Sequence, residues 1–250
     1  MNKLTLKNVS KSFGSFKVLD GINLEVTDGE SLAIVGPSGT GKSVLLKCIL
    51  GLIPIDSGEI WIEDKCVISK DHNDSEKYPG FFGMLFQGSA LFDSLPIWKN
   101  VAFGLIYGQG MDEKTARVLA METLDKVGLS KKVENLYPFE ISGGMQKRAS
   151  LARALVMKPQ MMLFDEPTTG LDPMMLSVIN QLIADTIRKE QVTAMTVTHD
   201  MSCLSAVAGR IILLYKGKII WEGSKDAFFT TQDPHITQFR QGAIEGPFSL

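Results

Sequence analysis

The sequence predicts an α/β fold with a mostly parallel core sheet, and three features of its 250 residues support this. From residue 159 onward, strand-like and helix-like segments alternate, which is typical of parallel strands joined by helical crossovers. The first 35 residues are β-rich, because short runs of alternating apolar residues are separated by turn residues. Between about residues 88 and 158 the pattern is largely helical, so we expect a helical insert in the core.

The first part of the chain contains four segments with an apolar pattern between turn residues. Glycines and Asp28-Gly29 mark the turns, because these residues tolerate tight backbone geometry. The polar stretch 69–80 is expected to be a loop. The four expected strands are Leu4–Val9, Val18–Val26, Ser31–Val35 and Glu59–Ile62.

Two helices of the insert have recognisable start signals. Asp112 precedes a segment whose apolar residues fall on one face, and Gly128 is expected to end that helix. Ser142 is expected to cap a second helix, which runs to Leu155. The glycines that follow Ser142 expose backbone N–H groups, so the start of this helix is a second candidate anion site.

The last part of the chain predicts strands and helices in alternation. Its first strand is a short, fully apolar run, as expected for a strand buried on both faces. The expected elements are strand Met161–Phe164, helix Pro173–Lys189, strand Val192–Val197, a helix from Asp200, strand Arg210–Tyr215 and strand Lys218–Trp221.

The composition is ordinary for a globular protein and narrows the class of function. Hydrophobic residues make up 44% of the chain and charged residues 22%. The formal net charge of -2 does not suit a nucleic-acid-binding protein, so no nucleic-acid partner is expected. The cysteines Cys48, Cys66 and Cys203 are scattered without metal-ligand spacing, which indicates a reducing, cytosolic setting. No apolar run approaches the roughly 20 residues of a membrane span.

The segment Gly36–Ser43 matches the phosphate-binding pattern G-x-x-x-x-G-K-[ST] at every fixed position. It lies between a predicted strand and a predicted helix, so its backbone N–H groups point at a phosphate chain. Lys42 can reach the β- and γ-phosphates, and Ser43 can place its hydroxyl on Mg²⁺. We therefore expect a nucleoside triphosphate to be bound by Gly36, Ser38, Gly39, Thr40, Gly41, Lys42, Ser43 and Val44.

Two carboxylates follow the apolar run 161–164. In a protein with a phosphate-binding loop, a buried strand that ends in an acid such as Asp165 supplies an outer ligand to Mg²⁺. The adjacent Glu166 is then placed to polarise an attacking water. In isolation, two acids after a core strand would carry no function, and it is the upstream loop that favours the catalytic interpretation.

In combination, these motifs resemble those of the ATP-binding cassette (ABC) ATPases over nearly the whole chain. Gly36–Ser43 resembles their Walker A motif, Met161–Glu166 their Walker B motif with its catalytic glutamate, and Ile141–Met145 their signature motif. Four further features fall where the family has functional residues: the Q-loop glutamine Gln87, the D-loop Thr169–Asp172, the switch histidine His199 and the adenine-stacking aromatic Phe13. For Phe13, a core aromatic at a strand end is the alternative.

The resemblance implies a P-loop NTPase of the ABC ATPase type with an N-terminal antiparallel β subdomain and a helical subdomain. Residues 1–230 would form the nucleotide-binding domain, with the insert at about 88–158, and residues 231–250 a C-terminal extension. ATP and Mg²⁺ are the implied cofactors, and a head-to-tail homodimer is the implied assembly. Met145 departs from the family, which mostly has glutamine at this position.

The same resemblance implies a role for each matched residue. Catalysis is assigned to Glu166, His199 and Gln87, and Mg²⁺ binding to Ser43, Gln87 and Asp165. Contact with nucleotide is assigned to Asp172 and, across the dimer, to Ser142, Gly143 and Gly144.

The amino-acid sequences of Gly83–Phe92, around Gln87, and of the signature motif are similar to those of the Mla-type ATPases, which move phospholipid between the membranes of Gram-negative bacteria. This implies a location at the cytoplasmic face of the inner membrane, with an integral-membrane permease, a STAS-domain regulator and a periplasmic MCE lipid-binding protein as partners.

The C-terminal tail, residues 238–248, is also similar to that group, in which it reaches the neighbouring subunit; a frayed terminus is the alternative. An importer ATPase for a polar solute such as an amino acid is the second candidate, and a soluble ABC protein of translation or DNA repair is a remote one.

Overall fold

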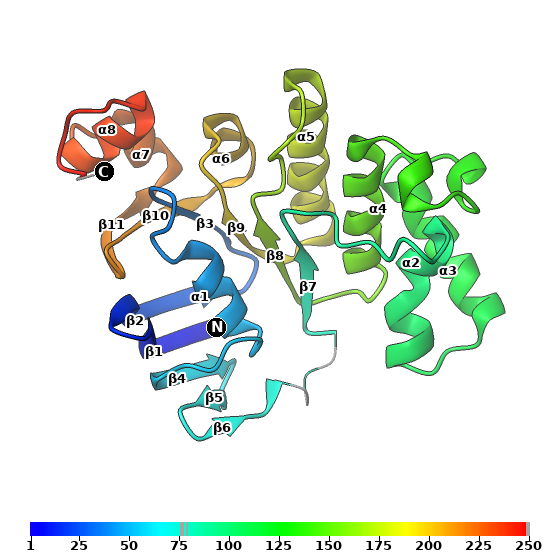
Figure 1. Cartoon of the computed structure of the whole chain (residues 1–250), viewed down its shortest axis with the longest axis horizontal. Helices are drawn as coiled ribbons and strands as arrows, with labels where there is room; N and C mark the ends of the chain where they lie inside the picture. Colours follow the sequence, from blue (N-terminus) through cyan, green and yellow to red (C-terminus); the bar gives the residue numbers. More distant parts are fainter. Residues whose placement is uncertain (76–77, 79, 249–250) are drawn as a thin grey trace. The chain divides into compact units, whose positions relative to one another are not determined.

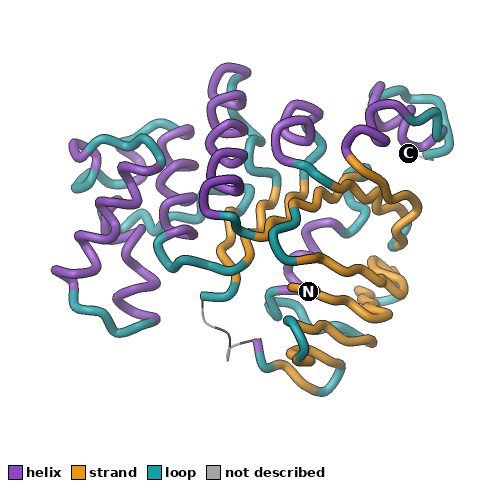
Figure 2. The backbone as a smooth tube through the Cα atoms, turned by 180° about the vertical axis from the view of Figure 1, so that it is seen from behind, coloured by secondary structure: helices purple, strands orange, loops and turns teal. Residues whose placement is uncertain are grey.

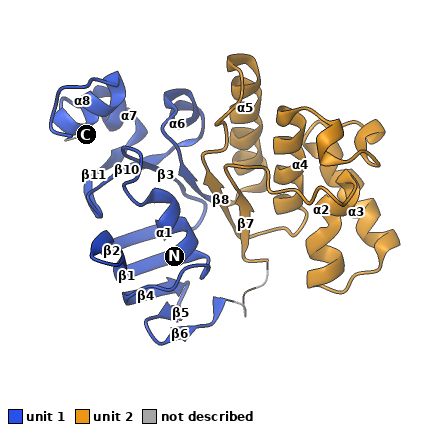
Figure 3. Ribbon diagram, in the orientation of Figure 1, with its two compact units in different colours: residues 1–77, 193–250 blue, residues 78–192 orange. Residues whose placement is uncertain are grey.

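The computed structural model describes residues 1–75, 78 and 80–248, and the chain divides into two compact units (Figure 3). The first unit combines residues 1–77 with residues 193–250, and the second comprises residues 78–192. Figure 1 traces the elements in chain order, and Figure 2 shows that strands dominate the first unit and helices the second.

The first unit contains an antiparallel sheet, as predicted for the N-terminal part of the chain. Its strand pairs are all antiparallel, and inward side chains such as Leu4 and Leu6 are buried. The strands, in sheet order, are β2 (Phe16–Thr27), β1 (Asn2–Phe13), β4 (Ser57–Ile62), β5 (Lys65–Ser69) and β6 (His72–Asn73).

A second set of strands in the first unit carries the phosphate-binding motif. The order is β11 (Lys218–Ser224), β10 (Arg210–Tyr215), β3 (Ser31–Val35) and β9 (Thr193–Val197), with β10, β3 and β9 parallel and β11 antiparallel. Strands β3 and β9 are buried along almost their whole length, as predicted for a parallel sheet. Their burial makes the sheet a rigid base for the loops that leave its edge.

Four helices of the first unit pack beside these strands: α1 (Lys42–Ile49), α6 (Met201–Val207), α7 (Lys225–Thr230) and α8 (Pro234–Gln241). Leu204 of α6, Phe228 of α7 and Ile236 of α8 are fully buried in one core with the β3 and β10 side chains. The apolar faces of α6, α7 and α8 thus cover one face of the sheet.

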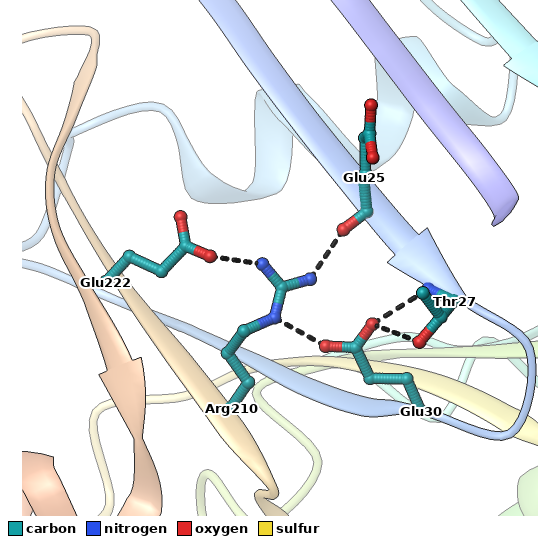
Figure 4. A network of polar contacts seen from close by, with 5 residues as sticks. All are labelled: Glu25, Thr27, Glu30, Arg210 and Glu222. Atoms are coloured by element: carbon teal, nitrogen blue, oxygen red, sulfur yellow. Dashed lines mark hydrogen bonds and ion pairs between the residues drawn. The ribbon is translucent and has the colours of Figure 1, made fainter.

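A single guanidinium ties three strands of the first unit together (Figure 4). Arg210 of β10 donates hydrogen bonds to the carboxylates of Glu30 and Glu222, and to the backbone carbonyl of Glu25. Burial raises the pKa of Glu30, but the hydrogen bonds from Arg210 and Thr27 outweigh it, so the pKa lies below the usual 4.5. The network joins the antiparallel sheet, through β2, to β10 and β11.

The second unit pairs two parallel strands, β7 (Phe82–Leu85) and β8 (Met161–Asp165), with a group of helices. The predicted caps are confirmed: Asp112 accepts from Thr115 N at 3.0 Å, and Ser142 accepts from Met145 N at 3.4 Å. The helical elements are α2 (Ile97–Phe103), the π-helical turn η2 (Gly104–Gly108), α3 (Glu113–Lys126), the 3-10 turns η3 (Lys131–Val133) and η4 (Pro138–Glu140), α4 (Gly143–Leu155) and α5 (Pro173–Glu190). Within the described residues, no helix combines the length and apolar character needed to cross a membrane.

Several elements differ from the sequence-based expectation. The predicted loop 69–80 contains β6, which pairs with the end of β5; residues 76, 77 and 79 of that loop lie outside the described residues. Strand β7 was not predicted, because Gly83 interrupts its β-propensity. A Cβ at Gly83 would lie only 2.5 Å from Met162 Sδ of β8, so this position needs the smallest residue.

The C-terminal tail is not frayed within the described residues. Helices α7 and α8 were not predicted, and the segment after α8 folds back onto its own unit. The Gln238 side chain donates to the carbonyls of Ala243 (3.1 Å) and Ile244 (3.3 Å) and accepts from Phe248 N (2.8 Å). Phe248 is 5% exposed and joins the core. A frayed terminus is therefore the wrong expectation.

Candidate nucleotide-binding site

The phosphate-binding loop closes on itself between β3 and α1. Gly36 has a φ of 150°, and a Cβ there would lie 2.2 Å from the carbonyl oxygen of Leu214, so only glycine fits. The buried Lys42 donates from Nζ to the carbonyl oxygens of Gly36 (2.7 Å) and Pro37 (2.8 Å), and Thr40 Oγ1 donates to Pro37 at 2.9 Å. The ammonium thus sits at the loop's own backbone, beside the first turn of α1, where a phosphate chain would complete its contacts.

A hollow of about 420 Å³ adjoins this loop in the first unit. One wall is the stretch Pro37–Thr40, and the opposite walls come from the β1–β2 hairpin and the turn after β10. Its lining residues include Phe16, Lys17, Val18, Tyr215 and Lys216. The combination of two aromatic rings, two lysines and a phosphate loop suits an anionic ligand with an aromatic base.

Phe13 lies at the end of β1 and is 49% exposed, so it is not the core aromatic of the alternative interpretation. Its ring centroid lies 5.5 Å from the ammonium of Lys11. Phe13 pairs across the hairpin with Phe16, and of the two it is Phe16 that lines the hollow. The adenine contact of Phe13 stays a prediction, and Phe16 was not singled out from the sequence.

A larger hollow, of about 960 Å³, lies along α3 in the second unit. Its lining includes Trp98, Arg117 and Met121, together with acidic side chains from α3. None of the residues that line it belongs to a phosphate-binding motif, so we do not consider it part of the nucleotide site.

His199 follows β9, the parallel neighbour of the strand that leads into the phosphate-binding loop. The register pairs Ile34 with Val197, and Thr198 N donates to the Ile34 carbonyl at 3.3 Å. Carboxyl ends of parallel strands meet at one edge of a sheet, so the exposed His199 emerges at the same edge as the loop. The next residue, Asp200, caps α6 by accepting from Ser202 N at 2.9 Å, which fixes where the strand ends.

The second unit brings Gln87, Asp165 and Glu166 to one edge in the same way. Leu85 of β7 is opposite Phe164 of β8; Asp165 is the last residue of β8, Glu166 follows it directly, and Gln87 lies two residues after the end of β7. Asp165 is 6% exposed, whereas the Gln87 side chain is exposed. Glu166 adopts a left-handed φ of 47°, uncommon for a residue with a side chain, and its Oε2 accepts from Thr169 Oγ1 at 3.4 Å. Such backbone strain is frequent at functional sites.

The predicted Mg²⁺ ligands have suitable chemistry. Ser43, Gln87 and Asp165 offer a hydroxyl, an amide carbonyl and a carboxylate, all hard oxygen donors of the kind that Mg²⁺ prefers. Gln87 and Asp165 share one strand edge of the second unit, while Ser43 opens α1 in the first. Over the described part of the chain, no group of three or more His, Cys, Asp or Glu side chains is arranged to hold a metal ion.

The signature segment forms the start of α4. Ser142 and Gly143 are exposed, whereas Gly144 is buried against α5, so closely that a Cβ there would lie 2.3 Å from Met175 Cε. Asp172 is exposed and caps α5, its Oδ1 accepting from Met174 N and Met175 N at 3.0 Å each. The Asp172 carboxylate thus has a structural role within its own chain in addition to the predicted contact with nucleotide.

Sequence reasoning missed a buried cation in α4. Lys147 is 5% exposed, and its ammonium donates to the backbone carbonyl of Gln87. Burial lowers the pKa of Lys147, and the carboxylate of Asp165 acts in the opposite direction. The sequence offered one signal for this burial: Lys147 shares a helix face with the apolar residues Leu151 and Ala154.

Comparison with known proteins adds an independent line of information. The family model for the ABC transporter matches residues 19–169. Among curated relatives, protein trigalactosyldiacylglycerol 3 of Arabidopsis thaliana is 40% identical over 261 residues, covering 96% of this chain and 74% of that protein. The probable ribonucleotide transport ATP-binding protein mkl of Mycobacterium leprae is 37% identical over 99% of this chain and 71% of that protein. The glutamate/aspartate import ATP-binding protein GltL of Escherichia coli K12 is 42% identical over 90% of this chain and 92% of that protein.

Solved structures show the same fold. A dimeric ATP-binding cassette in a post-hydrolysis state, bound to ADP and Pi, has a TM-score of 0.79 and 32% sequence identity, covering 89% of this chain and 98% of that one. A nucleotide-free cassette from an ABC transporter has a TM-score of 0.82 and 25% identity, covering 96% of this chain and 99% of that one.

Proposed function

This chain belongs to the ABC transporter family, and from this premise we propose that it is the ATP-hydrolysing subunit of a phospholipid transporter. Its ATP-binding cassette fold is shared with the solved relatives. The observation that carries the proposal of hydrolysis is the edge of the second unit, where Gln87, Asp165 and Glu166 follow two paired parallel strands. We propose that the cassette spans residues 1–230 and that residues 231–250 are a C-terminal extension.

In the proposed reaction, water attacks the γ-phosphate of ATP in line with the departing ADP. Lys42 and the N–H groups of the phosphate-binding loop would neutralise the phosphate charge, which is the main requirement of phosphoryl transfer. Glu166 would orient and deprotonate the water, and His199 would contact the transferred group. When bound, Mg²⁺ would neutralise charge on the phosphate oxygens; Ser43, Gln87 and Asp165 would hold it.

Replacement of Glu166 by glutamine tests the catalytic assignment. We expect turnover to fall at least about 100-fold, because the base is lost, while ATP affinity changes little. ATP hydrolysis and equilibrium binding of ATP should be measured on the same preparation. The exposed Glu122→Gln is the matched control and should behave as wild type. A Glu166→Gln protein that hydrolyses ATP at the normal rate contradicts the assignment.

We propose that two copies act together. One chain presents the phosphate-binding loop and the start of α4 on different compact units, and each of these is a candidate anion site. A head-to-tail homodimer would give each nucleotide the loop of one copy and Ser142, Gly143 and Gly144 of the other. The solved cassette bound to ADP and Pi is dimeric, which supports this arrangement.

The resemblance to Mla-type ATPases favours a lipid substrate. The relative named for trigalactosyldiacylglycerol matches 96% of this chain, the mycobacterial relative 99% and the glutamate/aspartate importer ATPase 90%. A name that refers to a diacylglycerol lipid agrees with the resemblance to Mla-type ATPases. The importer remains the second candidate because its identity, at 42%, is slightly higher than the 40% of the plant relative. The mycobacterial relative carries the name of a third substrate class, ribonucleotides.

An exposed aromatic ladder supports docking to a membrane permease. Phe92 and Phe103 lie with ring centroids 4.5 Å apart, and Phe103 and Tyr107 lie 4.7 Å apart. Phe92 is 43% exposed and Tyr107 58% exposed, while Trp98 and Val101 pack internally. Exposed rings of this kind commonly mark a protein interface. We propose that the chain binds its permease here, peripherally at the cytoplasmic face of the inner membrane.

Purification of the full chain from its native membranes in mild detergent tests the transporter assignment. Mass spectrometry should recover a permease, a STAS-domain protein, an MCE protein and phospholipid. Recovery of a permease with a solute-binding protein would replace the lipid with a polar solute. Ribosomal or DNA-repair proteins without a permease would contradict the transporter assignment as a whole.

A further inference from the structure

Side chains of α4 hold the backbone after β7 in place. We define residues 86–90 as the Gln87 loop. Five hydrogen bonds run from three α4 side chains to the carbonyl oxygens of this loop. The three donors, Lys147, Ser150 and Arg153, are spaced three residues apart, so they lie along one face of the helix.

Lys147 makes the contact nearest to the proposed chemistry. Its Nζ donates to the carbonyl of Gln87 and, at 3.4 Å, to the carbonyl of Phe86. The side chain is 5% exposed, and a buried ammonium is stable only where acceptors surround it. Hydrogen bonds to a charged donor are about twice as strong as neutral ones. Lys147 therefore restrains the residue that is proposed to bind Mg²⁺.

The rest of the loop is held in the same manner. Ser150 Oγ donates to the carbonyl of Ser89 at 2.5 Å, and Arg153 donates to the carbonyls of Ala90 (2.6 Å) and Ser89 (3.3 Å). Ala90 has a left-handed φ of 50°, so it belongs to neither a strand nor a right-handed helix. Its carbonyl group is instead held by the hydrogen bond from Arg153. The loop backbone is thus attached to α4 along its whole length.

The same helix begins at the signature segment. Ser142 caps α4, and Lys147 lies five residues further on, about 7.5 Å along the axis of a continuous helix. A helix transmits a displacement of its start directly to a residue one and a half turns away. A shift of Ser142 and Gly143 would therefore move the carbonyl to which Lys147 donates.

We propose that Lys147 is a positioning residue that makes the Gln87 loop follow α4. The proposal rests on the proposed function, in which the start of α4 contacts the nucleotide held by a second copy and Gln87 serves the Mg²⁺ of its own nucleotide. Lys147 then links the two nucleotide sites of the dimer: closure of α4 on one nucleotide sets the position of Gln87 at the other.

Hydrogen–deuterium exchange on the full chain, without nucleotide or Mg²⁺, tests the attachment itself. Lys147→Met removes the donor and keeps much of the side-chain volume. We expect the amide N–H groups of the Gln87 loop to exchange roughly tenfold faster, because the loop opens more often once the carbonyls of Phe86 and Gln87 lose their charged donor. Phe92 N donates to the buried Asn100 at 2.7 Å, so its protection should be unchanged and serves as an internal control.

A double-mutant cycle tests the positioning role. ATP hydrolysis is measured against Mg²⁺ concentration for Lys147→Met, Gln87→Ala and the double variant. We expect Lys147→Met to raise the half-saturating Mg²⁺ concentration about tenfold. If Lys147 acts through Gln87, the double variant should match Gln87→Ala alone. Lys147→Arg keeps a charged donor and should restore most of the wild-type Mg²⁺ dependence.

The matched control is Lys126→Met, which removes an exposed lysine of the same unit that pairs with Glu190 at 3.2 Å. It should leave exchange and Mg²⁺ dependence unchanged. Unaltered exchange of the Gln87 loop in folded Lys147→Met overturns the proposal, as does full additivity in the cycle. A wild-type chain that hydrolyses no ATP, alone or with its membrane partners, would instead contradict the proposed function, and the exchange result would still decide the attachment.

Discussion

Two loops of this protein follow short strands, and they are held in place in opposite ways. The phosphate-binding loop after β3 is held by its own residues, since Lys42 and Thr40 donate to carbonyls within the same motif. The Gln87 loop after β7 is held from outside, by α4 side chains about 60 residues further along the chain. The first loop is preorganised by local chemistry, whereas the second depends on where a helix lies.

This difference distinguishes a loop that carries its own restraints from a loop whose position depends on a helix. A loop that carries its own restraints keeps its shape when its surroundings shift. A loop restrained by another helix changes position with that helix. An ATPase that couples hydrolysis to movement needs both kinds.

The largest expected effect comes from breaking the self-held loop. Gly36→Ala places a Cβ against the carbonyl of Leu214, at 2.2 Å, so the loop or β10 must shift. We expect a loss of ATP affinity of about 100-fold, or about 2.7 kcal/mol. Gly39→Ala is the comparison for glycine loss in the same loop: a Cβ there meets nothing within 4 Å, so only the cost of its left-handed φ of 78°, about 1–2 kcal/mol, remains and the effect should be smaller.

Equilibrium titration with ATP measures both variants, and hydrogen–deuterium exchange should show an unchanged Gln87 loop. If Gly36→Ala bound ATP as tightly as wild type, the loop would not owe its shape to that glycine.

The second prediction concerns Asn100, which anchors the stretch that follows the Gln87 loop. Asn100 is fully buried, accepts from Phe92 N and donates to the carbonyls of Phe92 (3.0 Å) and Leu95 (2.8 Å). Asn100→Ala leaves these backbone groups without their partner, so we expect the free energy of unfolding to fall by about 2 kcal/mol. Urea denaturation measures this change.

Asn135→Ala, at an exposed position, is the control and should change stability by less than about 0.5 kcal/mol. ATP affinity should stay normal in Asn100→Ala, in contrast to Gly36→Ala. Equal stability of Asn100→Ala and wild type would mean that this external anchor is dispensable.

The third prediction uses an external anchor that is sensitive to pH. Arg210→Met removes the guanidinium that pairs with Glu30 and Glu222, and we expect a loss of about 1.5 kcal/mol in unfolding free energy at pH 7. The folded-state pKa of Glu30 is below its usual 4.5, so this stability is present above about pH 4.5 and is lost as the pH falls through the folded-state pKa.

Urea denaturation of wild type and Arg210→Met at several pH values measures the difference. The two curves should converge in acid. Arg188→Met, whose side chain is 72% exposed, is the control and should be nearly neutral. A stability difference that is constant from pH 7 to pH 3 would exclude the ion pair as its origin.

The same contrast explains what could be predicted from the sequence. The phosphate-binding loop was predictable because its restraints lie within eight consecutive residues, and the caps at Asp112 and Ser142 because each acts over three residues. Strands of the parallel sheet were predictable from short apolar runs, as β3 and β10 show.

Features that depend on distant partners were missed. The helix pattern could have marked Lys147 as buried, but its acceptor, the carbonyl of Gln87, lies 60 residues away in the sequence and only the fold brings it close. Phe16 reads as a hairpin residue, and only the fold brings it to the hollow beside Pro37 and Tyr215. The C-terminal tail has no regular pattern in the sequence, because it is ordered by hydrogen bonds between a single side chain, that of Gln238, and the backbone of Ala243, Ile244 and Phe248.

The position of β3 has a consequence for the synthesis of the protein. Both of its sheet neighbours, β9 and β10, lie in the last quarter of the chain. On a ribosome that adds about 5–20 residues per second, β3 therefore waits on the order of ten seconds for its first partner. During that time the apolar strand β3 is exposed to chaperones and to aggregation, and the phosphate-binding loop lacks the sheet that positions it. The capacity to bind ATP thus arises only after β9 and β10 have been made, so ATP can act as a ligand that favours molecules in which these strands have joined β3.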